Sequence, residues 1–129
     1  MLANRRRGIF KGEVYLVNPK HEQILGEECY PKVSDLPKIA ETVLVAIPSI
    51  HVPDAIDDAG QAGAVAGIVI SSGFAEIGNI ELEKQLVNAA SKHNLRILGP
   101  NCLGVYDPYT GMVTHYSFLK RSYCLMAGK

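Results

Sequence analysis

Four apolar runs each end in a short turn rich in Pro, Ser, Gly and Asn, and these turns hold the residues best suited to bind a ligand. The turns are Val17-Asn18-Pro19-Lys20, Ile47-Pro48-Ser49, Ile70-Ser71-Ser72-Gly73 and Gly99-Pro100-Asn101-Cys102-Leu103-Gly104. Open parallel sheets bind ligands at the carboxyl ends of their strands, where turns of this kind gather. We therefore predict one ligand-binding crevice along the edge of a sheet.

The residue types in these turns suit a ligand that carries phosphates and an adenine. Lys20 could neutralise a phosphate as a point charge, while Pro48 and Gly73 shape the backbone for close approach. Each residue also has a simpler explanation. Lys20 could be a surface lysine beside a turn, and Ser71 to Gly73 could cap a helix. The nucleotide interpretation therefore depends on the four turns together.

The segments that position these turns read as buried strands, because they are nearly continuously apolar instead of alternating. They are Glu13 to Val17, Thr42 to Ile47, Ala66 to Ser71 and Arg96 to Leu98. Helical patterns at Val52 to Gly63 and Asn79 to His93 separate the last three, which predicts crossover helices and parallel strands. We expect an α/β fold: a Rossmann-like parallel sheet with helices on both faces.

The connection between the first two strands is longer than the others. It holds a weak strand around Cys29 and Tyr30, followed by a predicted short helix from Ser34 to about Ala40. Asn79 can cap the helix that it begins. From Met112 onward no period is visible, so no element is predicted there.

Composition excludes several classes of function. Thirteen basic side chains balance thirteen acidic ones, so no overall field would recruit nucleic acid or an anionic membrane. No run is long enough to span a membrane or to form the apolar part of a signal peptide, which predicts a cytoplasmic protein. Three scattered cysteines and four scattered histidines indicate neither a disulfide framework nor a metal site. Arg5 to Arg7 is interpreted as a solvated helix face.

The order VNPK, LVAIPS, IVISSGFAE and RILGPNCLG resembles the CoA-binding domain of NDP-forming acyl-CoA synthetases. This family includes the α subunits of succinyl-CoA ligase and of ADP-forming acetyl-CoA synthetase. The resemblance covers roughly Phe10 to Thr110, and its motifs occur in the family's order and at matching spacings. It implies coenzyme A as the ligand.

The resemblance also implies which residues bind CoA. In such enzymes the lysine matching Lys20 and the residues matching Ile70 to Ser72 contact CoA, with the loop matching Ile47 to Ser49 beside it. The GPNCLG loop lies towards the phosphohistidine and the acyl substrate. The predicted CoA-binding residues are Asn18, Pro19, Lys20, Pro48, Ser49, Ile70, Ser71, Ser72, Gly73 and Asn101. No catalytic residue and no metal ligand is predicted.

The reaction implied by the resemblance converts acyl-CoA, NDP and phosphate to acid, CoA and NTP, through an acyl phosphate and a phosphorylated histidine. That histidine belongs to a following domain, and none of the four histidines here matches it. We therefore predict CoA binding without turnover by this chain alone. An alternative is a subunit that is active once a partner chain, such as an ATP-grasp β subunit, supplies the remaining parts.

Three other interpretations stay open. An exposed sheet edge could make the chain a structural or interaction module. A dinucleotide-dependent dehydrogenase is disfavoured, because no G-x-G-x-x-G turn is present. Cys102 could act as a nucleophile, although no histidine is placed by the sequence to activate it.

The chain departs from the family at its start. The family begins with a strand and a Gly-rich turn that opens the first helix, whereas Leu2 to Ile9 would match only the end of that helix. The absent strand would lie between the strands at 13–17 and 42–47. Its absence predicts a gap of about twice the 4.8 Å strand spacing. We therefore expect a homo-oligomer that exchanges or adds strands, or poor folding.

The C-terminal part also departs from the family. We predict a CoA-binding domain over residues 1–111 and an irregular tail over 112–129. Val113 to Lys129 does not resemble the expected continuation into a second domain, whereas another reading frame with permissible codons does. The hypothesis is a gene fragment, frame-shifted after its first domain and started at an internal methionine.

Overall fold

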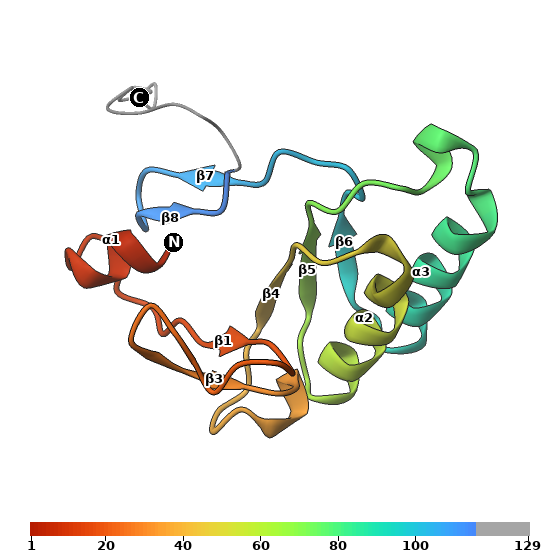
Figure 1. The fold of residues 1–129 in the computed structure, drawn as a ribbon. Coiled ribbons are helices and arrows are strands. Elements are labelled where there is room, and N and C mark those ends of the chain that lie inside the picture. Colours follow the sequence, from red (N-terminus) through yellow and green to blue (C-terminus); the bar gives the residue numbers. More distant parts are fainter. Residues whose placement is uncertain (116–129) are drawn as a thin grey trace. The chain divides into compact units, whose positions relative to one another are not determined.

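The structure is a computed structural model that describes residues 1–115 (Figure 1). By their contacts the residues form two compact units. One combines Met1–Val14 with the segment from Leu103 onward, and the other is Tyr15–Cys102. Each unit is described by itself.

The unit 15–102 contains the predicted parallel sheet. Its strands are β4 (Thr42–Val45), β5 (Ala66–Val69) and β6 (Arg96–Leu98), in the order β4-β5-β6. The crossover helices are α2 (Val52–Gln61) and α3 (Ile80–Lys92). Both pairings are parallel. The prediction of a Rossmann-like α/β fold is confirmed.

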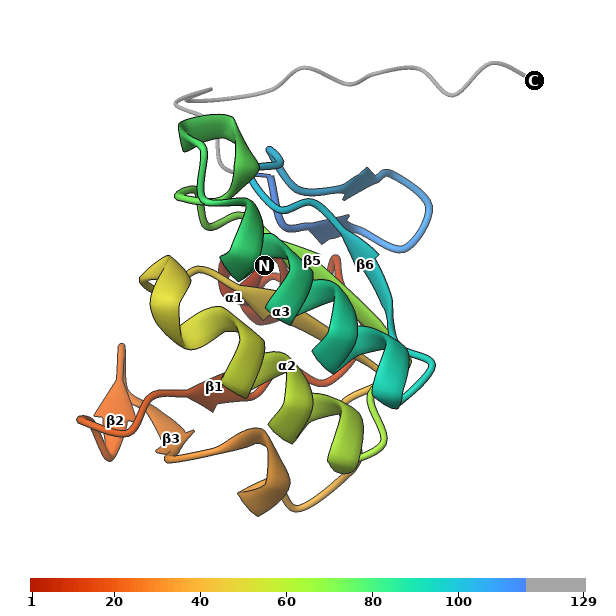
Figure 2. The same ribbon diagram turned by 90° about the vertical axis from the view of Figure 1, so that its right-hand side faces the viewer.

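The core of this unit lies between the sheet and the two helices. Val45 and Val69 point from the strands into one cluster with Ile56 of α2 and Leu86 of α3. Both helices therefore cover the same face of the sheet, and they lie side by side (Figure 2). On the opposite face Leu44, Ile68 and Leu98 form a row in register, and Leu44 and Leu98 remain 45% and 47% exposed. The described part of this unit places no helix over that row.

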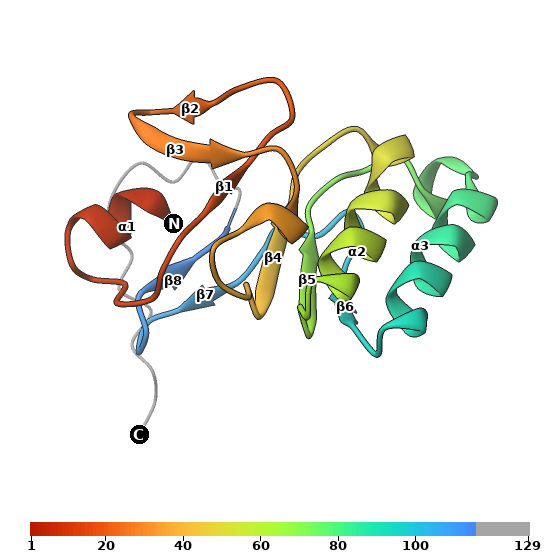
Figure 3. The same ribbon diagram turned by 90° about the horizontal axis from the view of Figure 1, so that it is seen from below.

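A second small sheet lies in the same unit, with β3 (Glu27–Tyr30) between β1 (Leu16–Val17) and β2 (Gln23–Ile24). The pairing of β1 with β3 is parallel, and β2 pairs antiparallel with β3. β1 is shorter than the predicted strand and belongs to a different sheet from β4. Figure 3 shows the order β2, β3, β1 and then β4, β5, β6.

The predicted helix over 34–40 is wrong. Only a short 3-10 helix, η1 (Val33–Asp35), forms there. Leu36 ends it with the extended angles φ −64° and ψ 143°. Pro37 explains this end, because the residue before a proline is driven out of the helical region.

Asp57 on α2 joins the two crossover helices. Its carboxylate accepts hydrogen bonds from Lys92 Nζ at 2.9 Å and His93 Nε2 at 2.7 Å. These two contacts, with the lysine contributing most, hold the pKa of Asp57 below its usual value. Gly60 lets the two elements approach closely, since a Cβ there would lie 2.5 Å from the His93 ring. His93 therefore has a structural role in the described part of the chain.

The other unit contains α1 (Leu2–Arg6), β7 (Tyr106–Asp107) and β8 (Met112–Val113). The strands pair antiparallel, and Asn4 Nδ2 donates to the Gly111 carbonyl at 3.0 Å. Met112 and Val113 were expected to be irregular, so this hairpin is an addition to the prediction. The rest of the predicted tail, residues 116–129, lies outside the described residues. No described helix is both long and apolar enough to cross a membrane.

Candidate functional site

The loops that follow β4, β5 and β6 are joined by hydrogen bonds. The Ser71 hydroxyl accepts from the Ile47 amide at 3.0 Å and donates to the Ile47 carbonyl at 2.6 Å. The backbone N–H of Asn101 donates to the Ser71 carbonyl at 2.9 Å. Ser71 therefore connects all three loops, and the carboxyl edge of the sheet is held in one arrangement.

Two glycines allow the backbones at this edge to come into contact. A Cβ on Gly73 would lie 2.6 Å from the Ser49 hydroxyl, and Gly73 has φ +110°. A Cβ on Gly99, which has φ +107°, would overlap the carbonyl oxygen of Val69. Both positions require glycine, for its left-handed backbone and for its missing side chain.

Cys102 contributes to the same packing. Its thiol lies 3.3 Å from the Val69 carbonyl and 3.6 Å from the Leu98 carbonyl, in donor geometry. These contacts account for the thiol as part of the loop framework. Both contacts are with backbone carbonyls, which cannot remove the thiol proton, so they do not support a role for Cys102 as a nucleophile.

The loop after β1 is anchored differently. The Asn18 amide donates to Tyr30 O at 2.8 Å, which ties this loop to β3. Asn18 Oδ1 accepts from the Lys20 amide at 2.9 Å and so forms the turn that carries Lys20. Lys20 itself is exposed. The hydrogen bonds of the described residues thus connect Lys20 to the small sheet, and Ser71 to the main sheet.

All ten predicted site residues follow the ends of strands in the unit 15–102. Five are exposed: Pro19, Lys20, Pro48, Ser72 and Asn101. The other five are partly buried: Asn18, Ser49, Ile70, Ser71 and Gly73. The structure brings the members after β4, β5 and β6 together. Their role as CoA contacts stays a prediction.

The acidic residues beside the loop after β5 were not predicted from the sequence. Glu76 accepts hydrogen bonds from the amides of Gly73 and of Phe74, the latter at 3.0 Å. Glu83 accepts from the Ala75 amide at 3.0 Å. Asn79, which the sequence predicts as a helix cap, instead donates its Nδ2 to Gly73 O at 3.2 Å. An available signal was the three glutamates within ten residues after Gly73, of which Glu76 and Glu83 bind the loop.

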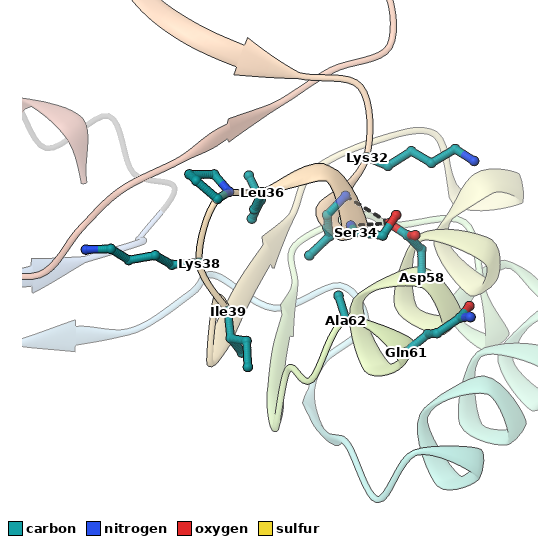
Figure 4. A pocket seen from close by; sticks show the side chains of 10 residues that line it. Lys32, Ser34, Leu36, Lys38, Ile39, Asp58, Gln61 and Ala62 are labelled. Carbon is teal, nitrogen blue, oxygen red and sulfur yellow. Dashed lines mark hydrogen bonds between the residues drawn. The ribbon is translucent and has the colours of Figure 1, made fainter.

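A hollow of about 520 Å³ lies elsewhere, beside the segments that lead into β4 and β5 (Figure 4). Asp58 forms part of its wall and accepts from the amides of Val33 and Ser34, at 2.8 and 3.3 Å. Lys32 and Lys38 extend away from it. None of the ten predicted residues lines this hollow. Among the described residues, no group of acidic, histidine and cysteine side chains could hold a metal ion.

A family model described as a CoA binding domain matches residues 1–108. The chain belongs to the CoA binding domain family. The resemblance seen in the four turn motifs is thereby confirmed, and the match includes all ten predicted site residues.

Curated relatives of this CoA-binding domain are ADP-forming ligases. The acetate–CoA ligase of Methanocaldococcus jannaschii is 36% identical over 103 residues, which is 80% of this chain and 15% of the relative. Acetate–CoA ligase I of Archaeoglobus fulgidus is 37% identical over 110 residues, or 84% of this chain and 16% of the relative. The chain spans about a sixth of the length of these relatives.

Solved structures agree with this assignment. The dinucleotide-forming acetyl-coenzyme A synthetase 1 of Candidatus Korarchaeum cryptofilum, in complex with phosphate and ADP, matches with a TM-score of 0.76 and 44% identity. The match covers 84% of this chain and 24% of that one. PH0766 from Pyrococcus horikoshii matches with a TM-score of 0.72 and 35% identity, over 78% and 24% of the two chains. The CoA-binding domain thus resembles one part of a larger enzyme.

Proposed function

We propose that this chain binds coenzyme A along the loops after β4, β5 and β6, with Lys20 as the cation for a CoA phosphate. The proposal depends chiefly on one observation, that Ser71 connects the three loops by hydrogen bonds. These bonds hold the carboxyl edge of the sheet in place before a ligand arrives. A preorganised edge lowers the cost of binding because less of the backbone has to be ordered. The family assignment supports CoA as the ligand, here a substrate more than a permanent cofactor.

Acyl-CoA ligation would then require additional protein. Relatives include the α subunits of two acetate–CoA ligases of Pyrococcus furiosus, and this supports a partner subunit, for which an ATP-grasp β subunit is our proposal. None of the four histidines matches the family's phosphorylated histidine, and His93 is held by Asp57. We therefore propose that the chain binds CoA and does not turn it over alone. The boundary at residue 111, the gene-fragment origin and the cytoplasmic location stay predictions from the sequence.

Replacing Lys20 with alanine should weaken CoA binding about tenfold, as expected for losing one charge contact of about 1.4 kcal/mol. Titration calorimetry with CoA measures this directly. Lys32→Ala is the matched control, because Lys32 belongs to the hollow beside η1 and lies outside the predicted site. If both variants bind CoA as tightly as the parent chain, Lys20 is not a CoA contact.

Among the described residues no strand pairs with β4 on the side away from β5, and this edge supports a second proposal, self-association. The carbonyls of Glu41 and Val45 accept hydrogen bonds from backbone amides on the β5 side. Successive residues of a strand direct their backbone hydrogen-bonding groups to opposite sides, so those of Thr42 and Leu44 point away from β5. No charged side chain or proline interrupts β4, and such residues usually protect an edge. We propose that a second copy of the chain adds a strand at this edge.

Light scattering should accordingly give a mass of at least two chains. Leu44→Lys should shift the distribution towards the monomer, because a charge on an edge strand disfavours pairing. Val87→Lys introduces the same side chain at an exposed position of α3 and should have no such effect. A monomeric parent chain at every concentration would refute the proposal.

A further inference from the structure

Three consecutive backbone amides in the loop after β5 all donate to carboxylates. The amides of Gly73 and Phe74 donate to the two oxygens of Glu76, and the amide of Ala75 donates to Glu83. Hydrogen bonds to charged acceptors are stronger than neutral ones. This short segment is therefore held more firmly than a surface loop usually is.

The other side of the same segment is fixed as well. The side chain of Asn79 donates from Nδ2 to the Gly73 carbonyl at 3.2 Å, and the backbone N–H of Asn79 donates to the Phe74 carbonyl at 3.0 Å. The Phe74 side chain is completely buried. The loop thus has anchors on its amides, on its carbonyls and in the core.

This segment directly follows Ser71 and Ser72, which are predicted to contact CoA. Gly73 also touches the Ser49 side chain from the loop after β4, since a Cβ there would lie 2.6 Å from its hydroxyl. The position of Gly73 therefore affects two loops of the predicted site. Whatever fixes Gly73 also fixes the surface that CoA would meet.

We propose that Glu76 and Glu83 are positioning residues for CoA binding, which hold the segment Gly73–Ala75 in its ligand-ready shape without touching the ligand. The inference rests on the proposed function, because it concerns the same edge of the sheet. Glu76 supplies two acceptors and Glu83 one, so Glu76 should have the larger effect.

The electrostatics of Glu76 agree with this role. Hydrogen bonds from backbone amides, that of Gly73 foremost, lower the pKa of Glu76, while partial desolvation opposes them. Because folding lowers the pKa of Glu76, the stabilising contribution of its carboxylate is fully present above the unfolded pKa of about 4.3. This contribution is lost as the pH falls through the lower pKa of the folded state. From α3, Glu83 faces the same loop, and Glu81 and Lys84 form an exposed pair 3.8 Å apart.

The test compares Glu76→Ala, Glu76→Gln and Glu83→Ala with the control Glu81→Ala. Glu81 is an exposed glutamate on α3, the helix that also carries Glu83. Calorimetry with CoA, thermal melting and amide hydrogen exchange are measured for each variant. Glu76→Ala should weaken CoA binding about tenfold, the equivalent of about 1.4 kcal/mol. The amides of Gly73 and Phe74 should exchange faster, with little change in melting temperature. Glu76→Gln should recover part of the affinity, because its single amide oxygen still accepts one of the two hydrogen bonds.

The outcomes separate this inference from the proposed function. If the parent chain binds CoA and Glu76→Ala binds it equally well while its amides exchange faster, the positioning role is refuted and CoA binding stands. If the variants lose stability in proportion to affinity, the glutamates are merely structural and the inference is also refuted. If the parent chain does not bind CoA, the proposed function fails, and the positioning role fails with it.

Discussion

Replacing Gly99 with alanine should destabilise the unit 15–102 by about 2 to 5 kcal/mol, which combines a left-handed backbone penalty with overpacking. Gly99 has φ +107°, and an added Cβ would overlap the carbonyl oxygen of Val69 in the adjacent strand. That oxygen belongs to backbone in the middle of the sheet, so it cannot move aside as a flexible side chain can. Urea unfolding followed by circular dichroism measures the change.

Gly26→Ala is the matched control for this prediction. Gly26 also has a positive φ, +77°, but an added Cβ there meets nothing within 4 Å. This variant should cost about 1 to 2 kcal/mol, the backbone penalty alone. The difference between the two variants measures the close approach of the loop after β6 to β5. Equal losses of stability in the two variants would mean that the loop after β6 shifts to accommodate the added methyl group. The loop would then not be held rigidly against β5.

Phe74→Ala should lower the free energy of unfolding by about 3 to 5 kcal/mol, the usual cost of removing a buried phenyl ring. Phe74 is fully buried and belongs to the cluster formed by β4, β5 and the two crossover helices. Its loss would leave a cavity that neighbouring side chains can fill only in part. The same urea titration gives the result.

Ile77→Ala provides the comparison, because Ile77 lies three residues further along and is 71% exposed. A surface substitution of this kind should change stability by no more than about 0.5 kcal/mol. Similar effects for both variants would contradict the assignment of Phe74 to the core. A large effect confined to Phe74 would show that the loop after β5 depends on the core for its position.

Much of the fold could be predicted from the sequence because the apolar pattern depends on local residues. β4, β5 and β6 lie within their predicted segments, and α2 and α3 agree with prediction to within two residues at each end. The error at 34–40 arose where Pro37 outweighed a helical pattern. The short hairpin of β7 and β8 was missed, because two-residue strands leave no period to detect.

The site was predictable only in part, for a related reason. Strand ends can be located from the sequence, so the turns after β4, β5 and β6 were found. The partners of those turns depend on contacts between segments distant in the chain. That Ser71 would bind Ile47, and Glu83 the Ala75 amide, could not be inferred from spacing alone. Helices were expected on both faces of the sheet, whereas α2 and α3 pack on the same face. The apolar pattern of a helix shows which of its sides is buried, but not which face of the sheet it covers.

The hydroxyl of Ser71 has a final consequence for the chemistry of the edge. A serine hydroxyl has one proton and two lone pairs. Its proton is given to the Ile47 carbonyl, and one lone pair receives the Ile47 amide, so that the side chain imitates a peptide group and adds a rung to the β4–β5 ladder. Only one lone pair is left. Towards a ligand, this hydroxyl can therefore accept but not donate, which suits an amide N–H or an amino group and disfavours a phosphate oxygen.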